Sequence, residues 1–112
     1  MINSHPLLKA AKDAAWNGDH DQTITLCSGA LAGQNPDSAQ RIDLLDIRAE
    51  SYIAQGKLDL AWQDVQMMHD SFDDDARPEF QAKAYNRQAR VELVQGKLDQ
   101  AIASAKVAAE AA

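Results

Sequence analysis

The pentapeptide Gln55-Gly56-Lys57-Leu58-Asp59 recurs letter for letter as Gln95-Gly96-Lys97-Leu98-Asp99. An alanine lies seven residues before each glycine and another lies five residues after it, so the two copies extend beyond the identical stretch. A weaker third copy, Asn17-Gly18-Asp19-His20-Asp21, lies near the N-terminus. The three glycines are separated by 38 and 40 residues. A repeat of this length is typical of proteins built from stacked helical units.

Apolar residues on both sides of each glycine recur at steps of three and four, which is the spacing of one face of a helix. In the second copy, Leu45, Ala49 and Tyr52 precede the glycine, and Ala61 and Val65 follow it. Glycine ends the first helix of each pair because it adopts the left-handed conformation without a Cβ clash. The sequence therefore predicts an all-α fold with helices near residues 5–17, 20–33, 36–55, 58–72, 77–95 and 98–110.

Prolines and acidic residues mark the boundaries between the repeats. Asn35-Pro36-Asp37 predicts a helix with Asn35 as its N-cap and Pro36 in its first turn. The run 73–79, with its aspartates and a proline, predicts a similar start for the fifth helix. We interpret residues 1–112 as one domain of three helix-turn-helix repeats, which cover about 4–35, 36–75 and 76–112.

The helical units resemble the tetratricopeptide repeat (TPR) family. The matching residues are Leu7, Ala11, Gly18 and Ala30 in the first copy, Leu45, Ala49, Tyr52, Gly56, Leu58 and Ala61 in the second, and Tyr85, Ala89, Gly96, Leu98, Ala101 and Ala108 in the third. Arg48 and Gln88 depart from the family pattern because they stand at its apolar seventh position. The spacing also exceeds the family's period of about 34 residues, which implies longer helices.

This resemblance implies a TPR-like α-solenoid of six antiparallel helices, in which the first helices of the repeats line a concave groove. It also implies a non-catalytic protein–protein interaction module that holds a peptide or helix of a partner protein, with no cofactor. The partner-binding candidates at or beside the groove positions are Lys12, Trp16, Asp46, Glu50, Lys83, Asn86, Arg87 and Arg90. Lys83 and Arg87 match two of the residues with which some TPR domains hold a C-terminal carboxylate. Trp16 is either a binding anchor or a cover for the alanine-rich first helix.

Charge is distributed unevenly along the chain. The formal net charge of −6 divides into −1 for residues 1–41, −7 for residues 42–75 and +2 for residues 76–112. We therefore expect a groove that is acidic in the middle and basic at its end. The acidic balance disfavours nucleic acid and anionic membrane surfaces as partners.

Several other classes of protein are disfavoured by the composition. No stretch approaches the roughly 18 apolar residues of a membrane span, and the N-terminus does not look like a signal peptide, so we expect a cytoplasmic protein. Cys27 is the one cysteine and is interpreted as a core residue. The three histidines lack metal-ligand spacing, and the acidic run 70–75 lacks the glycine and distal glutamate of a calcium loop. With no acid–base pair, metal set or phosphate loop, we expect no enzymatic activity.

The final helix is rich in small apolar residues and has no polar outer face of the kind that ends a solenoid. Ile102, Ala105 and Ala109 are therefore candidates for self-association. They suggest an alternative function, in which the chain is a regulatory or oligomerisation domain that controls a neighbouring effector, such as a bacterial regulator or cyclase.

Overall fold

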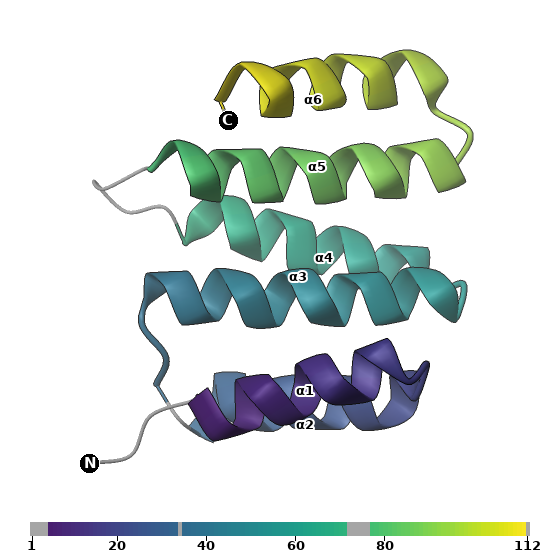
Figure 1. Cartoon of the computed structure of the whole chain (residues 1–112). Coiled ribbons are helices and arrows are strands. Elements are labelled where there is room, and N and C mark those ends of the chain that lie inside the picture. Colours follow the sequence, from purple (N-terminus) through teal and green to yellow (C-terminus); the bar gives the residue numbers. More distant parts are fainter. Residues whose placement is uncertain (1–4, 34, 72–76, 112) are drawn as a thin grey trace.

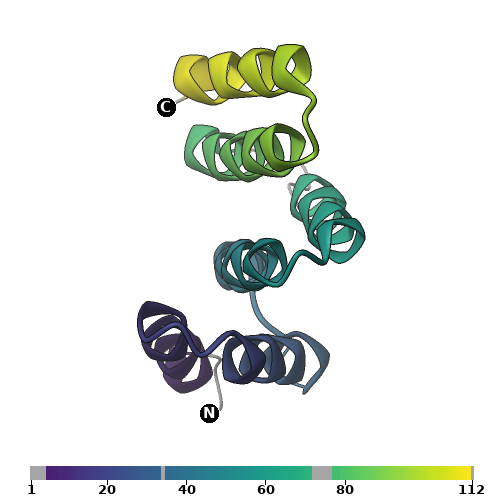
Figure 2. The ribbon, with the colours of Figure 1, turned by 90° about the vertical axis from the view of Figure 1, so that its right-hand side faces the viewer.

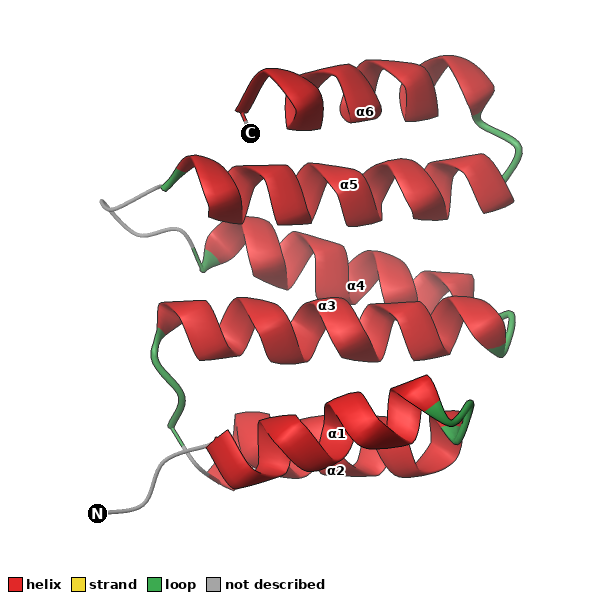
Figure 3. Ribbon diagram, viewed as in Figure 1, coloured by secondary structure: helices red, strands yellow, loops and turns green. Residues whose placement is uncertain are grey.

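The structure, a computed structural model, describes residues 5–33, 35–71 and 77–111. These residues form helices joined by short loops, without a strand among them (Figure 3). The helices are α1 (His5–Trp16), α2 (His20–Gly33), α3 (Ser38–Ala54), α4 (Leu58–Asp70), α5 (Pro78–Val94) and α6 (Leu98–Ala111). The all-α prediction is confirmed, and every boundary lies within two residues of its predicted place.

The start of α3 differs from the prediction, because Asp37 rather than Asn35 is the N-cap. The Asp37 carboxylate accepts a hydrogen bond from the Gln40 backbone N–H at 2.8 Å, and the Gln40 side chain accepts one from the Asp37 N–H at 3.3 Å. This reciprocal capping box satisfies the backbone N–H groups of Asp37 and Gln40. The helix therefore begins two residues later than predicted, at Ser38.

One turn geometry closes all three helix pairs. Gly18, Gly56 and Gly96 have φ of +75°, +74° and +82°, the left-handed region that glycine adopts without strain. In each turn, the backbone N–H of the residue after the glycine bonds to a carbonyl five residues earlier, at 2.8 to 2.9 Å. These bonds satisfy carbonyls at the end of each first helix, as in a Schellman motif.

The first helices of the three pairs, α1, α3 and α5, lie side by side and run in the same direction (Figure 1). Helix α2 packs on α1 and α3, and α4 packs on α3 and α5. Within the described ranges, α6 packs on α5 alone. In Figure 2, α2 lies beside α1, whereas α6 lies above α5. The direction from the first to the second helix of a pair therefore rotates along the chain.

The core consists of apolar clusters that join each helix pair to the first helix of the next pair. One cluster contains Leu8, Ala11, Cys27, Ala30 and Leu44, from α1, α2 and α3. Two more join α3, α4 and α5 through Ile42, Leu45, Met68, Phe80 and Ala84, and through Ala49, Ile53, Ala61, Val65 and Val91. Helix α6 contributes to none of these clusters and buries only Ala101, Ser104 and Ala108.

The glycine turns give a matched pair of stability tests. Gly56→Ala forces a Cβ into the left-handed region and should lower the free energy of unfolding by about 1–2 kcal/mol. Gly29→Ala lies inside α2, with nothing within 4 Å of the added Cβ, and should raise it by about 0.5–1 kcal/mol. Urea denaturation followed by circular dichroism measures both. Equal effects of the two changes would contradict the role assigned to the turn.

Candidate functional site

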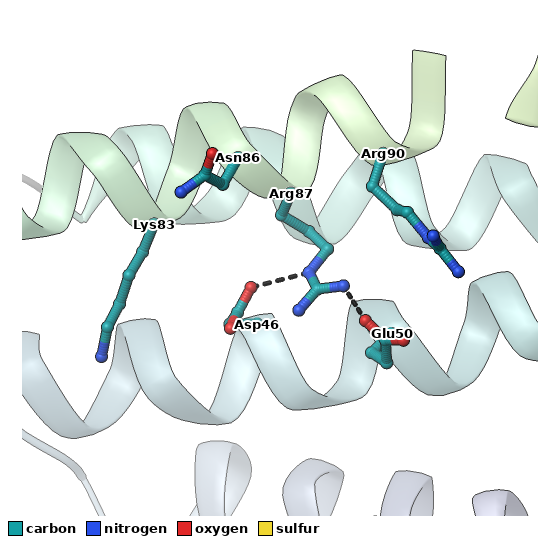
Figure 4. A pocket seen from close by; sticks show the side chains of 6 residues that line it. All are labelled: Asp46, Glu50, Lys83, Asn86, Arg87 and Arg90. Carbon is teal, nitrogen blue, oxygen red and sulfur yellow. Dashed lines mark hydrogen bonds and ion pairs between the residues drawn. The ribbon is translucent and has the colours of Figure 1, made fainter. Parts of the chain in front are cut away.

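The charged pocket lies between α3 and α5, on the side where the first helices are aligned (Figure 4). It has a volume of about 430 Å³. Its lining residues are Asp46, Glu50, Lys83, Asn86, Arg87 and Arg90. All six were predicted from the sequence as partner-binding candidates, and the structure brings them together although they come from two different repeats.

Ion pairs across this pocket hold α3 to α5. Arg87 donates from Nε to Asp46 Oδ1 at 2.7 Å and from Nη1 to Glu50 Oε2 (Figure 4). Lys83 Nζ pairs with Asp43 Oδ1 at the neighbouring turn. Lys83 and Arg87 of the third repeat therefore offset part of the acidic charge of the second repeat within the chain itself. Lys83 and Arg87, the two residues that match a carboxylate clamp, are already engaged by carboxylates of α3.

Arg90, Lys83 and Glu50 are the most exposed charged groups of the pocket, and Arg90 and Glu50 have unbonded atoms for a partner. Arg90 is exposed and makes no ion pair or hydrogen bond with any described residue. The Glu50 side chain is 44% exposed, and only one of its oxygens is bonded to Arg87. Repeat periodicity puts Lys12, Glu50 and Arg90 at the same position of α1, α3 and α5. Because these helices lie side by side, positive, negative and positive side chains follow one another across the surface.

The other predicted candidates lie outside the pocket. Lys12 is exposed on α1. Trp16 ends α1 and is 90% exposed, so it does not cover the alanine-rich face of its helix in the way that one reading of the sequence suggested. Ala54 and Val94 occupy the equivalent position in α3 and α5, and both are also exposed. The self-association candidates Ile102, Ala105 and Ala109 are exposed on α6.

A buried ion pair inside the second repeat was missed by the sequence reasoning. Arg48 donates from Nε to Asp64 Oδ2 at 2.9 Å and from Nη2 to Asp64 Oδ1 at 2.5 Å, and its Nη1 donates to Ser28 Oγ at 3.0 Å. The Arg48 guanidinium also lies 5.7 Å from the centre of the Tyr52 ring. The side chains of Arg48 and Asp64 are 14% and 2% exposed. This one side chain of α3 therefore contacts both α2 and α4.

The electrostatics of this pair reflect its burial. Burial raises the pKa of the Asp64 carboxyl above its ordinary value, and the hydrogen bonds and charge of Arg48 act in the opposite direction. Burial alone would lower the pKa of Arg48, but the hydrogen bond and charge of Asp64 outweigh it and raise that pKa. Two fixed hydrogen bonds between a guanidinium and a carboxylate are the arrangement that best compensates such desolvation.

The third repeat carries a different polar network at the equivalent positions. Gln88 stands in place of Arg48, and Ser104 stands in place of Asp64. Ser104 Oγ donates to Glu92 Oε1 at 2.6 Å, and Gln88 Nε2 donates to Glu92 Oε2 at 3.4 Å. Gln88 Oε1 also lies 2.8 Å from Nε2 of His69. The network joins α4, α5 and α6. Arg48 and Gln88, the two residues that depart from the TPR pattern, therefore both form hydrogen bonds to neighbouring helices.

Cys27 lies in the apolar cluster of α1, α2 and α3, and its side chain is fully buried. This position confirms its interpretation as a core residue. Burial raises the pKa of the Cys27 thiol to about 12, and the charge of Arg48 partly opposes this effect. The thiolate is the reactive form of cysteine, so the folded chain presents no reactive thiol at neutral pH.

Acidic and metal-ligating side chains, and the apolar character of the helices, bear on two other kinds of site. In 5–33, 35–71 and 77–111, no three His, Cys, Asp or Glu side chains lie close enough to share a metal ion. Of the acidic run 70–75, Asp70 is an exposed residue at the end of α4, and Asp73, Asp74 and Asp75 lie outside the described residues. None of the described helices is long and apolar enough to cross a membrane.

Comparison of the chain with protein-family models, with curated proteins and with solved structures gave no match. The TPR resemblance therefore rests on the sequence pattern alone.

The buried ion pair predicts a large asymmetry between single and double variants. Arg48→Met leaves the Asp64 carboxylate buried without a counter-charge and should lower the free energy of unfolding by about 3 kcal/mol. Arg48→Met with Asp64→Leu should recover most of this loss, because an apolar pair replaces the charges. Lys83→Met is the control, since it breaks a half-exposed pair worth about 1 kcal/mol or less. Urea denaturation measures all three, and a double variant as unstable as Arg48→Met would contradict this assignment.

The environment of Cys27 predicts its chemical behaviour. Because the thiol is buried and its pKa is raised to about 12, alkylation by iodoacetamide at slightly alkaline pH should be slow in the folded chain. In denaturing urea the same thiol should react at the rate of a free cysteine. Equal rates with and without urea would show that Cys27 is accessible in the native state.

Proposed function

We propose that this chain is a TPR-like solenoid that acts as a non-catalytic protein–protein interaction module. In this proposal, a peptide or helix of a partner protein binds on the surface of α1, α3 and α5, at the charged pocket. The charged pocket, with Arg90 unpaired and Glu50 half exposed, is the observation that carries the proposal. No cofactor is required for such binding.

The pattern of helix contacts supports the solenoid part of the proposal. Each first helix contacts the next first helix, and each of α2 and α4 contacts the first helix of the following pair. Among the described residues, α2, α4 and α6 do not contact one another. Stacked repeats produce this pattern because each unit packs only on its neighbours.

The rigidity of the pocket supports a binding role. Arg87 is 18% exposed and is fixed by Asp46 and Glu50, so α3 and α5 keep their spacing without a ligand. A preformed surface loses less conformational entropy on binding. The accessible charges Lys12, Glu50 and Arg90 suit a segment that carries both acidic and basic residues. The exposed Trp16 and Val94, at the end of the same surface, offer apolar contacts of the kind found at binding hot spots.

Selection from a displayed library of short random peptides tests the proposal. Arg90→Glu should weaken the selected peptides by about tenfold or more, because a charge-assisted hydrogen bond is replaced by repulsion. Lys57→Glu is the matched control, since it makes the same charge change at an exposed turn outside the pocket. Arg87→Glu is unsuitable, because it would place three acids together and disturb the fold.

The change in affinity is measured by calorimetry with the wild-type chain and both variants. We expect the selected peptides to contain an acidic residue and to bind more weakly at high salt. Peptides that bind wild type and Arg90→Glu equally would overturn the assignment of the pocket. A library that yields no binder would count against the interaction function itself.

The alternative function, a regulatory or oligomerisation domain for a neighbouring effector, is favoured by a different surface. Leu98 and Ile102 on α6 are each more than half exposed and lie one helical turn apart, and contiguous exposed apolar side chains mark interaction surfaces. This surface does not overlap the pocket, so the two functions are compatible.

A further inference from the structure

Helix α6 exposes an apolar face made of Leu98, Ile102, Ala105 and Ala109, which we call the α6 face. Leu98 is 57% exposed and Ile102 is 59% exposed, and both alanines are exposed as well. The four residues follow one another at steps of four, three and four, so they share one side of the helix. This side adjoins the stripe of Ala101, Ser104 and Ala108 that α6 buries against α5.

The second repeat shows what these positions do when a neighbour covers them. Leu58, Trp62 and Val65 of α4 are the equivalents of Leu98, Ile102 and Ala105. They pack in the cluster that contains Val91 of α5, and Val65 is fully buried there. In the third repeat no described helix covers the same positions. The α6 face therefore occupies positions that pack against a following helix in the second repeat, but no described helix packs on them in the third.

Charged residues beside the α6 face point to one particular partner. From the residue before α6 to its last turn, the charges alternate in the order Lys97, Asp99, Lys106 and Glu110. Asp99 and Lys106 are seven residues apart, so they lie within about 20° of each other around the helix, along one edge of the face. Neither makes an ion pair with a described residue. When these four charges are read from the C-terminal end instead, their order is negative, positive, negative and positive.

We propose that the α6 face binds the α6 face of a second copy of this chain, with the two helices antiparallel. A two-fold axis perpendicular to both helices brings the same edge of each face together. Asp99 of each copy then lies opposite Lys106 of the other, and Glu110 lies near the positive N-terminal end of the second helix. Both Asp99–Lys106 pairs form at once, because an isologous contact repeats every interaction.

The apolar residues fit this register without adjustment. With Asp99 opposite Lys106, the axis passes between positions 102 and 103, so the two Ile102 side chains meet at the centre. With a rise of 1.5 Å per residue, Leu98 of one copy falls midway between Ala105 and Ala109 of the other, about 3 Å along the axis from each. A large side chain thus faces the gap between two small ones, as in knobs-into-holes packing.

Other arrangements of two copies fit less well. A parallel α6 pair would place Asp99 opposite Asp99 and Lys106 opposite Lys106. A head-to-tail stack would place α6 against α1, whose exposed side chains include Lys9, Lys12 and Asp13. Those residues offer a charged surface rather than an apolar one. The antiparallel pair alone satisfies both the apolar face and the charges beside it.

Sedimentation equilibrium of the full chain, from low micromolar to millimolar concentration, tests the proposal. We expect a reversible monomer–dimer equilibrium for the wild type. Ile102→Glu should raise the dimer dissociation constant at least about tenfold, because it places two carboxylates side by side at the axis. Val107→Glu, a similar change on another side of α6, should leave it unchanged. A wild-type monomer at every concentration, or equal effects of the two changes, would overturn the dimer.

A charge swap tests the antiparallel register. Asp99→Lys alone and Lys106→Asp alone should each weaken self-association, because each places like charges opposite one another. An equimolar mixture of the two variants should associate at least as well as the wild type, since every pair across a mixed dimer is then opposite in sign. Circular dichroism of each variant checks that α6 is intact.

A mixture that stays monomeric while the wild type dimerises would overturn the antiparallel register, and species larger than a dimer would indicate head-to-tail stacking instead. Arg90→Glu should leave the dimer unchanged. Failure of the dimer and failure of the peptide-binding function are therefore distinguishable.

Discussion

The bonds from Arg48 to Asp64 and Ser28 are the interaction on which the middle of the structure depends. One guanidinium on α3 bonds to α4 and α2, and it does so where both charges are largely removed from water. Such a pair contributes little net free energy compared with an apolar alternative. A displaced partner, however, leaves a buried charge uncompensated, which strongly destabilises the fold. The pair therefore fixes how α2 and α4 sit on α3. Because α3 also contacts α1 and α5, the placement of α2 and α4 on α3 affects how the other helices pack.

The repeats keep one backbone design and vary the side chains inside it. The glycine turns are nearly identical in φ and hydrogen bonding. At the same interior positions, however, the second repeat holds an ion pair and the third holds a hydrogen-bonded network around Glu92. In the charged pocket, the positions of Asp46 and Glu50 in the second repeat are occupied by Asn86 and Arg90 in the third. The repeated units are thus chemically distinct, which gives the molecule a direction and places a charged pocket between α3 and α5.

Much of the fold could be predicted because its signals are local. The repeated glycine and the three- and four-residue spacing of apolar residues located the helices to within two residues. The predicted start of α3, at residue 36, was wrong by two residues. Asn35 and Asp37 are both good N-caps, and only the contact with Gln40 decides between them. Five of the pocket residues were found because they stand at groove positions of adjacent repeats, and Arg87 was found because it matches a carboxylate clamp. Their ion pairs were not, since Asp46 and Arg87 are 41 residues apart and their alignment depends on how the repeats stack. Arg48 was taken as a departure from a pattern, because its partner Asp64 lies on another helix.

Among the residues that the structure describes, α6 packs on α5 alone, and this has a consequence for the dynamics of the chain. Helices in the interior of the stack open only if contacts on two sides break, whereas α6 opens when one set of contacts is lost. Its amide hydrogens should therefore exchange with solvent before those of α3, and the glycine turn at Gly96 marks where this fraying stops. Protection of α6 that rises with protein concentration would connect local unfolding to assembly, because pairing adds contacts that must break before α6 opens.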